Sequence, residues 1–341
     1  MAEATEMELV LPADDPNATA RFFVDELGFA IAAVRHSEDP REIVVVGRGL
    51  RVALVRGAAG EPGTLRAEGA IARTLRAPNG TRIEIAPRAP MAMPELAPAL
   101  DVARMRSAVW QEGRAGMRYR DLIASRQGGR HLASHIRVET DGPVPDCVHL
   151  HRVRFQMIYV RRGEVRVVYE DQGPPFTMRE GDCVLQPPTI RHRVLDARGL
   201  EVVEVSCPAD HDTLADAAMS LPNEALDPTR RFDGQRFVFH RAEEAGPTRE
   251  GDVLVRDAGI GEATGGLAQV RVLRAPAGAR IDAGSADHEL RFLYVLDGGL
   301  ELANVEPLGP DDAVSLPTAL DVDARASEPG VTVLSVTARA L

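Results

Sequence analysis

The chain has 341 residues with a formal net charge of −11, and hydrophobic residues make up 44% of it. This length favours two or three domains. An acidic chain lacks the basic surface of a nucleic-acid-binding protein, and no apolar run approaches the roughly 20 residues that span a bilayer. The start, MAEATEMELV, lacks the basic region and apolar core of a secretory signal. We therefore expect a cytoplasmic protein without nucleic-acid or membrane partners.

The basic and cysteine residues exclude several classes of chemistry. All 40 basic residues are arginine. Enzymes that form an imine with lysine, such as pyridoxal-phosphate enzymes, and nucleotide-binding P-loops are therefore excluded. The three cysteines, Cys147, Cys183 and Cys207, form no C-x-x-C pair. Their odd number argues against a disulfide framework, and we expect buried thiols.

Residues 7–87 predict a β-α-β-β-β unit. A short apolar strand precedes a helix that we expect to begin after Asp15 as N-cap and to end at Gly28. Runs rich in β-branched residues follow, separated by turn signals. An Asn79-Gly80 turn then introduces the final strand.

The segments LPADDP, FFVDELGF and PNGTRIEI resemble one module of the glyoxalase and extradiol dioxygenase superfamily, the vicinal oxygen chelate fold. The resemblance implies a module over residues 1–90 whose metal-ligand positions are Glu8 and Glu84. A complete site in that superfamily uses two modules, and one is visible here. We therefore expect this module to be structural, or to pair two chains in a homodimer.

The rest of the chain predicts a duplicated β-domain. Residues 91–116 are dense in Pro and Ala, which is typical of a linker, with a short helix from about residue 101. Beyond them, short strands broken by Gly and Pro indicate a sandwich or barrel. FQMIYVRRGEVRV parallels LRFLYVLDGGLEL, and GDCVLQPP parallels DDAVSLPT. The predicted parts are a first barrel over 117–215, a connection over 216–250 and a second barrel over 251–341.

The first repeat carries a candidate metal site. His149 and His151 are two residues apart, so on a strand they point to one face. The pattern H-x-H-x4-Q-x6-G, with its glutamine at Gln156, is followed by G-D-x5-P-x3-H, which ends at His192. These two motifs resemble those of the cupins. The resemblance implies a jelly-roll barrel in which these four residues bind a divalent transition metal.

The predicted ligands do not determine which metal binds. Three imidazoles and one amide oxygen suit Fe, Mn, Ni, Co, Cu or Zn. A neutral Gln156 in place of a carboxylate leaves a divalent site at a net charge of +2, which favours an anionic substrate. Glutamine cannot accept a proton, so a general base must come from elsewhere. The alternative is a metal-free barrel in which the histidines form a hydrogen-bonded polar patch.

Other polar residues near the motifs are less clear. Cys147 shares the face of His149, and we expect a buried thiol there rather than a ligand. His135 and Arg137 lie on one face of a strand, either toward the pocket, where they would bind an anionic substrate, or on the exterior. We expect three further residues outside the site, two pointing outward and one at a domain edge: Arg152, Arg154 and His211.

The second repeat has lost the motif. The positions equivalent to the four ligands hold Gly284, Ala286, Arg291 and Val322, and His288 is out of phase with them. We therefore expect the second barrel to be structural.

The predicted fold is mainly β, with two cupin jelly-roll barrels and an N-terminal βαβββ module. The predicted function is that of a metal-dependent dioxygenase or other oxidoreductase acting on a small organic acid or an aromatic compound. Two alternatives stay open: a metal-dependent isomerase or lyase of sugar-acid type, and a non-catalytic ligand-binding or sensing bicupin.

Overall fold

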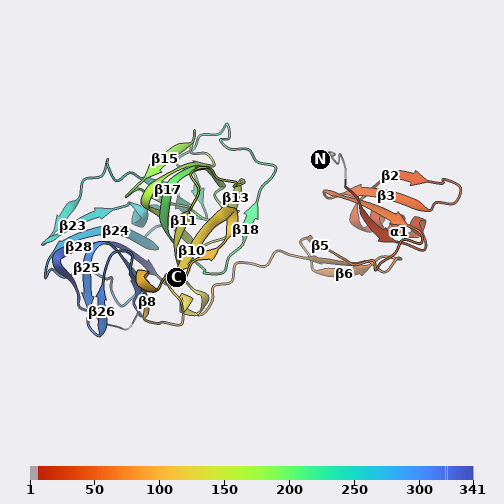
Figure 1. Cartoon of the computed structure of the whole chain (residues 1–341). Helices are drawn as coiled ribbons and strands as arrows, with labels where there is room; N and C mark the ends of the chain where they lie inside the picture. Colours follow the sequence, from red (N-terminus) through yellow and green to blue (C-terminus); the bar gives the residue numbers. More distant parts are fainter. Residues whose placement is uncertain (1–6, 319, 321, 341) are drawn as a thin grey trace. The chain divides into compact units, whose positions relative to one another are not determined.

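The computed structural model describes residues 7–318, 320 and 322–340. The chain divides into two compact units, Met1–Pro90 and Met91–Leu341 (Figure 1). The helices within the described ranges are all too short or too polar to cross a membrane.

The first unit contains the predicted β-α-β-β-β order. Its elements are β1 (Leu9–Pro12), α1 (Pro16–Leu27), β2 (Ala30–Arg35), β3 (Glu42–Gly47) and β4 (Leu50–Val55). The sheet order is β1-β4-β3-β2, and β1 is parallel to β4. Both helix ends agree with the sequence. The Ala18 N–H donates to Asp15 Oδ1 over 2.9 Å, and Gly28 adopts a left-handed φ of 70°.

A second sheet in this unit was predicted only in part. It contains β5 (Thr64–Glu68), β6 (Arg73–Arg76) and β7 (Arg82–Ala86) in the order β5-β7-β6. The first two strands are short and polar, so their hydrophobic alternation is weak. Glu8 pairs with Arg51, and Glu84 pairs with Arg66. Neither carboxylate belongs to a candidate metal cluster within the described ranges. The likeness of this unit to the glyoxalase superfamily stays a prediction.

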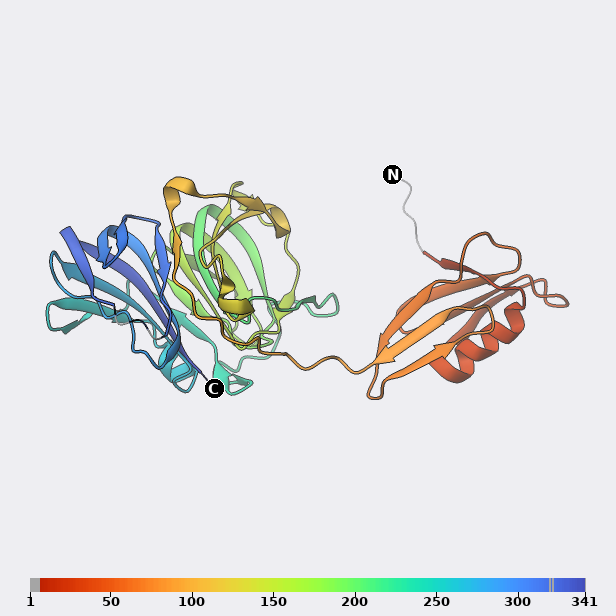
Figure 2. The same cartoon turned by 90° about the horizontal axis from the view of Figure 1, so that it is seen from below.

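Two large sheets make up most of residues 91–341 (Figure 2). The first sheet comprises β9 (Gln111–Glu112), β10 (Met117–Asp121), β11 (Leu132–Val138), β12 (Gly142–Pro143), β13 (His149–His151), β14 (Phe155–Tyr169), β15 (Phe176–Arg179), β16 (Cys183–Leu185), β17 (His192–Cys207), β18 (Thr213–Ala215) and β21 (Val238–His240). The second comprises β8 (Asp101–Ala103), β22 (Thr248–Glu250), β23 (Val253–Asp257), β24 (Ala268–Pro276), β25 (His288–Leu302), β26 (Val305–Leu308), β27 (Ala313–Ser315) and β28 (Ala324–Arg339).

The smaller elements of this unit lie between these strands along the chain. They are the turns η1 (Met105–Ser107), η2 (Arg114–Gly116) and η3 (Arg126–Gly129), the hairpin of β19 (Arg231–Phe232) and β20 (Gln235–Arg236), and the short helix α2 (Ile260–Ala263).

The repeat seen in the sequence is a repeat of topology. Each sheet is built on two long antiparallel strands, β14 with β17 and β25 with β28. Gly163 and Gly298 occupy equivalent points on β14 and β25, with φ of 72° and 74°. A Cβ at Gly163 would lie 2.3 Å from the Arg198 carbonyl oxygen, and one at Gly298 would lie 2.0 Å from that of Gly330. Only glycine fits where these strands bend past their partners.

The segments predicted to be linkers are partly built into the sheets. Within 91–116, the expected short helix is reduced to the single turn η1, and strands flank it: β8 pairs with β27 of the second sheet, while β9 pairs with β10 of the first. Within 216–250, β21 pairs with β16 of the first sheet. Isolated strands of two or three residues gain their stability from the sheet edges they join, so their own sequence gives little signal.

Side chains alternate along β14 between two environments. Phe155, Met157 and Tyr159 pack into a core shared with Phe292 and Tyr294 of the second sheet. Residues 156 and 158 face the interior of the first barrel, where they line a cavity. The interior of the second barrel is instead a closed hydrophobic core.

A buried charge cluster joins the two barrels and corrects the prediction for Arg154. This side chain is buried rather than directed to solvent, and its Nη1 donates to Glu289 Oε1 of β25 over 2.6 Å. Arg130 Nη2 donates to Glu289 Oε2 over 2.7 Å, and His131 Nε2 lies 3.5 Å from Oε1. Burial disfavours the Glu289 carboxylate, but its contacts with His131 and the two guanidinium groups bring its pKa down to about 2.

Replacing Glu289 by Gln should destabilise the protein by about 3–5 kcal/mol, because two buried guanidinium groups lose their counter-charge. The same change at Glu306, whose pair with Arg106 is exposed, should cost less than about 1 kcal/mol. Chemical denaturation measures both differences.

The Glu289 contribution should also depend on pH. Its pKa is lower in the folded chain than its ordinary value of 4.5, so its stabilisation is present above pH 4.5 and is lost as the pH falls toward about 2. The Glu289→Gln variant should therefore lose less stability than the wild type between pH 4.5 and 3. An equal loss in both proteins would contradict this assignment.

Candidate metal centre

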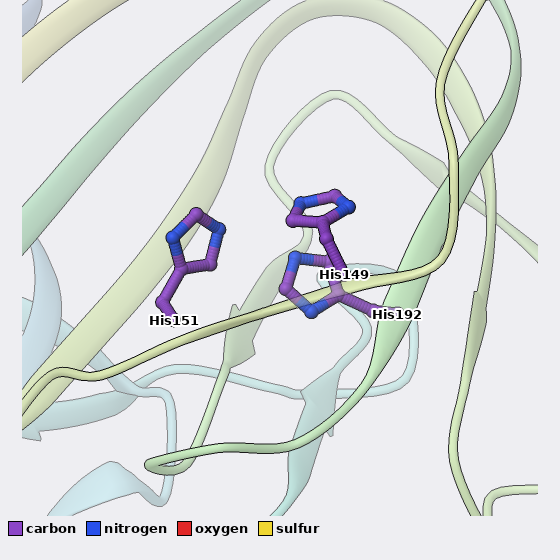
Figure 3. Close-up of side chains that lie close together, drawn as sticks. All are labelled: His149, His151 and His192. Carbon is purple, nitrogen blue, oxygen red and sulfur yellow. The ribbon is translucent and has the colours of Figure 1, made fainter. Parts of the chain in front are cut away.

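Three histidines converge at one end of the first barrel (Figure 3). His149 and His151 lie on β13. His192 is the first residue of β17, which pairs with β13 so that His192 lies opposite His149. Ring centroids are separated by 4.3 Å for His149 and His192, 5.1 Å for His149 and His151, and 5.2 Å for His151 and His192. One nitrogen from each ring lies within 4.8 Å of the other two. The structure thus brings together three of the four predicted ligands.

Hydrogen bonds at Nδ1 orient all three rings. His149 Nδ1 lies 2.8 Å from the Cys147 carbonyl oxygen, and His192 Nδ1 lies 3.1 Å from that of Ile190. His151 Nδ1 lies 2.9 Å from Thr213 Oγ1. A carbonyl oxygen only accepts hydrogen bonds, so Nδ1 of the first two rings carries the proton and donates, and Nε2 carries the lone pair. This is the arrangement in which a histidine presents Nε2 to a metal.

The surroundings keep these histidines neutral. Burial lowers the pKa of all three, and the neighbouring histidines lower that of His151 and His192 further. The pKa of His192 falls to about 3. Each ring therefore has an unprotonated nitrogen near pH 7, as metal coordination requires.

Gln156 lines the same cavity as the three histidines and has an unpaired oxygen. Its Nε2 donates to Glu204 Oε1 over 2.9 Å, and this bond fixes which end of the amide is which. Within the described residues, Gln156 Oε1 is buried and has no hydrogen-bond partner. A buried acceptor without a partner is costly unless a cation or a ligand meets it. The donor set of three imidazoles and one amide oxygen therefore fits a metal.

Glu204 was missed in the sequence. It lies on β17, twelve residues after His192, and burial raises the pKa of its carboxyl despite the hydrogen bond from Gln156. An even separation along one strand places both side chains on the same face, which is the signal that could have found it. Glu204 lines the cavity and carries a group able to exchange protons there.

The metal candidates line a cavity of about 390 Å³ inside the first barrel. Most of its wall is apolar, and it includes Ile136 and Leu132 from β11 and Val165 and Val167 from β14. Tyr169 stacks near His192, and its hydroxyl accepts a hydrogen bond from Gln186 over 2.7 Å. The cavity has the size of a site for a small molecule.

Arg114 stands at this cavity and was also missed. It lies in η2, within the predicted linker, and its side chain is 40% exposed. Its Nη1 donates to Asp146 Oδ1 over 2.7 Å, and its Nη2 lies 3.0 Å from His149 Nε2. The turn lies between the paired strands β9 and β10, but Arg114 is held at the cavity by Asp146, 32 residues further along, so the local sequence carries no signal for this contact.

Two predictions around the histidines are wrong. His211 lines the cavity, with its ring 5.4 Å from that of His151, because β18 pairs with β13 and brings the preceding residues alongside. Cys147 is exposed, and its thiol is outside the metal cluster. Its backbone carbonyl, rather than its sulfur, is the group that meets His149.

His135 and Arg137 face away from the cavity, which is lined instead by Ser134, Ile136 and Val138 of the same strand. His135 is fully buried, with Nε2 2.7 Å from Glu201 and Nδ1 3.2 Å from the Tyr294 hydroxyl. Arg137 stacks over the Trp110 ring, 4.2 Å from its centroid. Both residues therefore share the face away from the cavity, where His135 is buried against Tyr294 of the second sheet.

A second cluster of possible ligands lies between the barrels. His131, Cys207 and Glu289 approach one another closely enough to hold an ion. Arg130 and Arg154 already bind both oxygens of this carboxylate. Two guanidinium groups would repel a metal cation, so the cluster is better explained as part of the interface.

Residues 135–207 match the family model of the cupin domain. They form a cupin domain. The matched residues include the four predicted ligands and Glu204, whereas Arg114 and His211 lie outside the match. No curated protein sequence matches the chain.

Solved structures with a similar fold include two oxalate decarboxylases. That of Bacillus subtilis at pH 4.6 has 12% sequence identity and a TM-score of 0.52, covering 73% of this chain and 77% of that one. The Lactobacillus farciminis enzyme in its formate complex has 11% identity and a TM-score of 0.53, covering 71% and 86%. A further structure of the Bacillus enzyme addresses its Mn(II) centres. At these identities the likeness concerns the fold alone.

Replacing His192 by Ala in the cupin domain should reduce bound Mn²⁺ or Fe²⁺ from about one ion per chain to almost none. The reason is that the site loses its only histidine ligand from β17. His149→Ala should behave in the same way. His288→Ala, in the second barrel, is the control and should bind metal as the wild type does. Elemental analysis after dialysis measures the content, and equal content in all proteins would exclude this site.

Removing the acceptor at Glu204 should weaken metal binding about 10- to 100-fold, because the Gln156 amide loses the bond that orients it. Glu204→Leu tests this loss. Glu204→Gln, whose amide oxygen can still accept from Gln156, should retain most of the affinity. Competition with a chelator measures both, and similar affinities for the Leu variant and the wild type would contradict a ligand role for Gln156.

Proposed function

We propose that the cupin domain is a metal-dependent enzyme that acts on a small organic acid or aromatic compound, most directly as an oxygenase or other oxidoreductase. The observation that carries the proposal is the convergence of three neutral imidazoles and an unpaired amide oxygen on an apolar cavity. Such a set suits Fe, Mn, Ni, Co, Cu or Zn. The Mn(II) centres of a structural neighbour are compatible with this range.

Each residue of the site has a distinct part in this proposal. His149, His151, Gln156 and His192 would hold the ion, which when bound would supply Lewis-acid chemistry and, if redox-active, chemistry with dioxygen. Gln156 cannot take up a proton. Glu204 fixes the Gln156 amide through a 2.9 Å hydrogen bond and places a carboxyl group at the cavity wall.

The cavity wall favours an apolar substrate body. A sugar acid carries several hydroxyl groups, each of which needs a hydrogen-bond partner when buried. Ile136, Val165 and Val167 offer none, whereas they suit an aromatic ring or an alkyl chain. This favours the oxygenase over the sugar-acid isomerase or lyase. A lyase remains the second candidate, because the structural neighbours are decarboxylases.

The proposed function is tested by oxygen consumption. The Fe²⁺-loaded full-length chain, mixed with a panel of aromatic and aliphatic acids, should consume dioxygen with at least one of them, and His192→Ala should not. Release of carbon dioxide without oxygen uptake would instead support the lyase. Ligand binding without either reaction, across the panel and with Fe²⁺ or Mn²⁺, would support the non-catalytic alternative.

A further inference from the structure

Arg114 contacts the ring nitrogen of His149 that would coordinate a metal. Its Nη2 lies 3.0 Å from His149 Nε2, and the protonated Nδ1 of the same ring leaves Nε2 as the acceptor of this contact. A lone pair cannot serve a guanidinium and a metal at once. An arginine is also the least suitable neighbour for a cation, because its charge is permanent.

The side chain is nevertheless built into this position. Its Nη1 donates over 2.7 Å to Asp146 Oδ1, and the Asp146 side chain is only 1% exposed. The other carboxylate oxygen of Asp146 accepts from the Val194 N–H over 3.0 Å, which ties the anchor to β17. With Nη1 held, Nη2 can turn from His149 toward the cavity without the arginine leaving the site.

A donor released in this way needs an acceptor. Among the described residues that line the cavity, Arg114 is the one arginine, and the nearby wall is mostly apolar. The carboxyl of Glu204 already accepts from Gln156. The acceptor that best matches a guanidinium fork is a carboxylate carried by the ligand itself.

We propose that Arg114 is a specificity-determining residue that binds the carboxylate of an acid whose remaining body is apolar, after metal binding releases the guanidinium from His149. This inference rests on the proposed function and narrows its substrate class. The 390 Å³ cavity takes an aromatic or medium-chain acid. Oxalate, with two charges and no apolar surface, matches neither the single arginine nor the wall.

The test compares an acid with its uncharged amide of the same shape. Calorimetry on the Mn²⁺-loaded full-length chain should show that 3-phenylpropanoate binds about 10- to 100-fold more tightly than 3-phenylpropanamide, because a charge-assisted hydrogen bond is lost in the amide. Oxalate should bind more weakly than 3-phenylpropanoate. Arg114→Gln should lower this acid-to-amide ratio about 10-fold, mainly through weaker binding of the acid.

A matched control separates this role from a general effect of charge. Arg118 is exposed to a similar degree, 42% against 40%, but it pairs with Glu139 away from the cavity. Arg118→Gln should keep the wild-type ratio. A ratio retained in Arg114→Gln, or lost equally in both variants, would overturn the inference.

Metal binding gives a second readout that does not depend on turnover. The signal of free Mn²⁺ in electron paramagnetic resonance should show that Arg114→Gln binds the ion at least as tightly as the wild type, because a competing cation is gone. Weaker binding in this variant would contradict the proposed release. If wild-type protein binds no Mn²⁺ but keeps an Arg114-dependent preference for the acid, the metal centre fails and the acid-binding role of Arg114 stands.

Discussion

The antiparallel pairing of β14 with β17 is the constraint on which the first barrel depends. The pair runs from Phe155 opposite Cys207 to Tyr169 opposite His192, and it bends where Gly163 passes the carbonyl oxygens of residues 198 and 199. Between the register shifts of this pair, alternation assigns the side chains to one of two environments. Gln156 and Glu204 then meet inside the barrel, while Phe155 and Met157 pack against the second sheet.

The two barrels share the same arrangement of long strands, but the first contains the candidate site and the second a closed hydrophobic core. The second barrel keeps the long strand pair and the bend at Gly298. At the position of Gln156 it has Arg291, whose guanidinium donates to the carbonyl oxygens of residues 283, 317 and 320. Val322, at the position of His192, joins the hydrophobic core. Loss of the site therefore accompanies filling of the cavity, which removes the cost of burying unpaired polar groups.

The connection between the barrels combines apolar packing with buried charge. Phe155 and Tyr159 of the first barrel share a core with Phe292 and Tyr294 of the second. Around this core, Arg154 binds Glu289, and Arg161 binds Asp311 over 2.7 Å. Buried ion pairs add little net stability over apolar packing, but an unpaired partner is costly, so such pairs disfavour any other register of the two barrels. This accounts for residues 91–341 forming one compact unit.

The sequence by itself determined the parts that depend on local spacing. The H-x-H pair, the glycine bends and the repeat of the long strands follow from a two-residue period and from a backbone that only glycine can adopt. They were enough to predict the mainly β fold, the duplicated barrels and the cluster of His149, His151 and His192. The loss of the ligand motif from the second repeat is also visible in the sequence, because the equivalent positions hold Gly284, Ala286, Arg291 and Val322.

Only the tertiary structure decided which residues complete the site. Arg114 reaches the cavity from the short turn between β9 and β10, where it binds Asp146, and His211 reaches it because β18 pairs with the distant strand β13. The pairing of β11 with β17 turned His135 and Arg137 away from the cavity, and the contact between the two barrels placed Arg154 against Glu289. Local spacing defines a face of a strand, but which face meets a cavity, a neighbouring barrel or solvent depends on contacts between residues far apart in the chain.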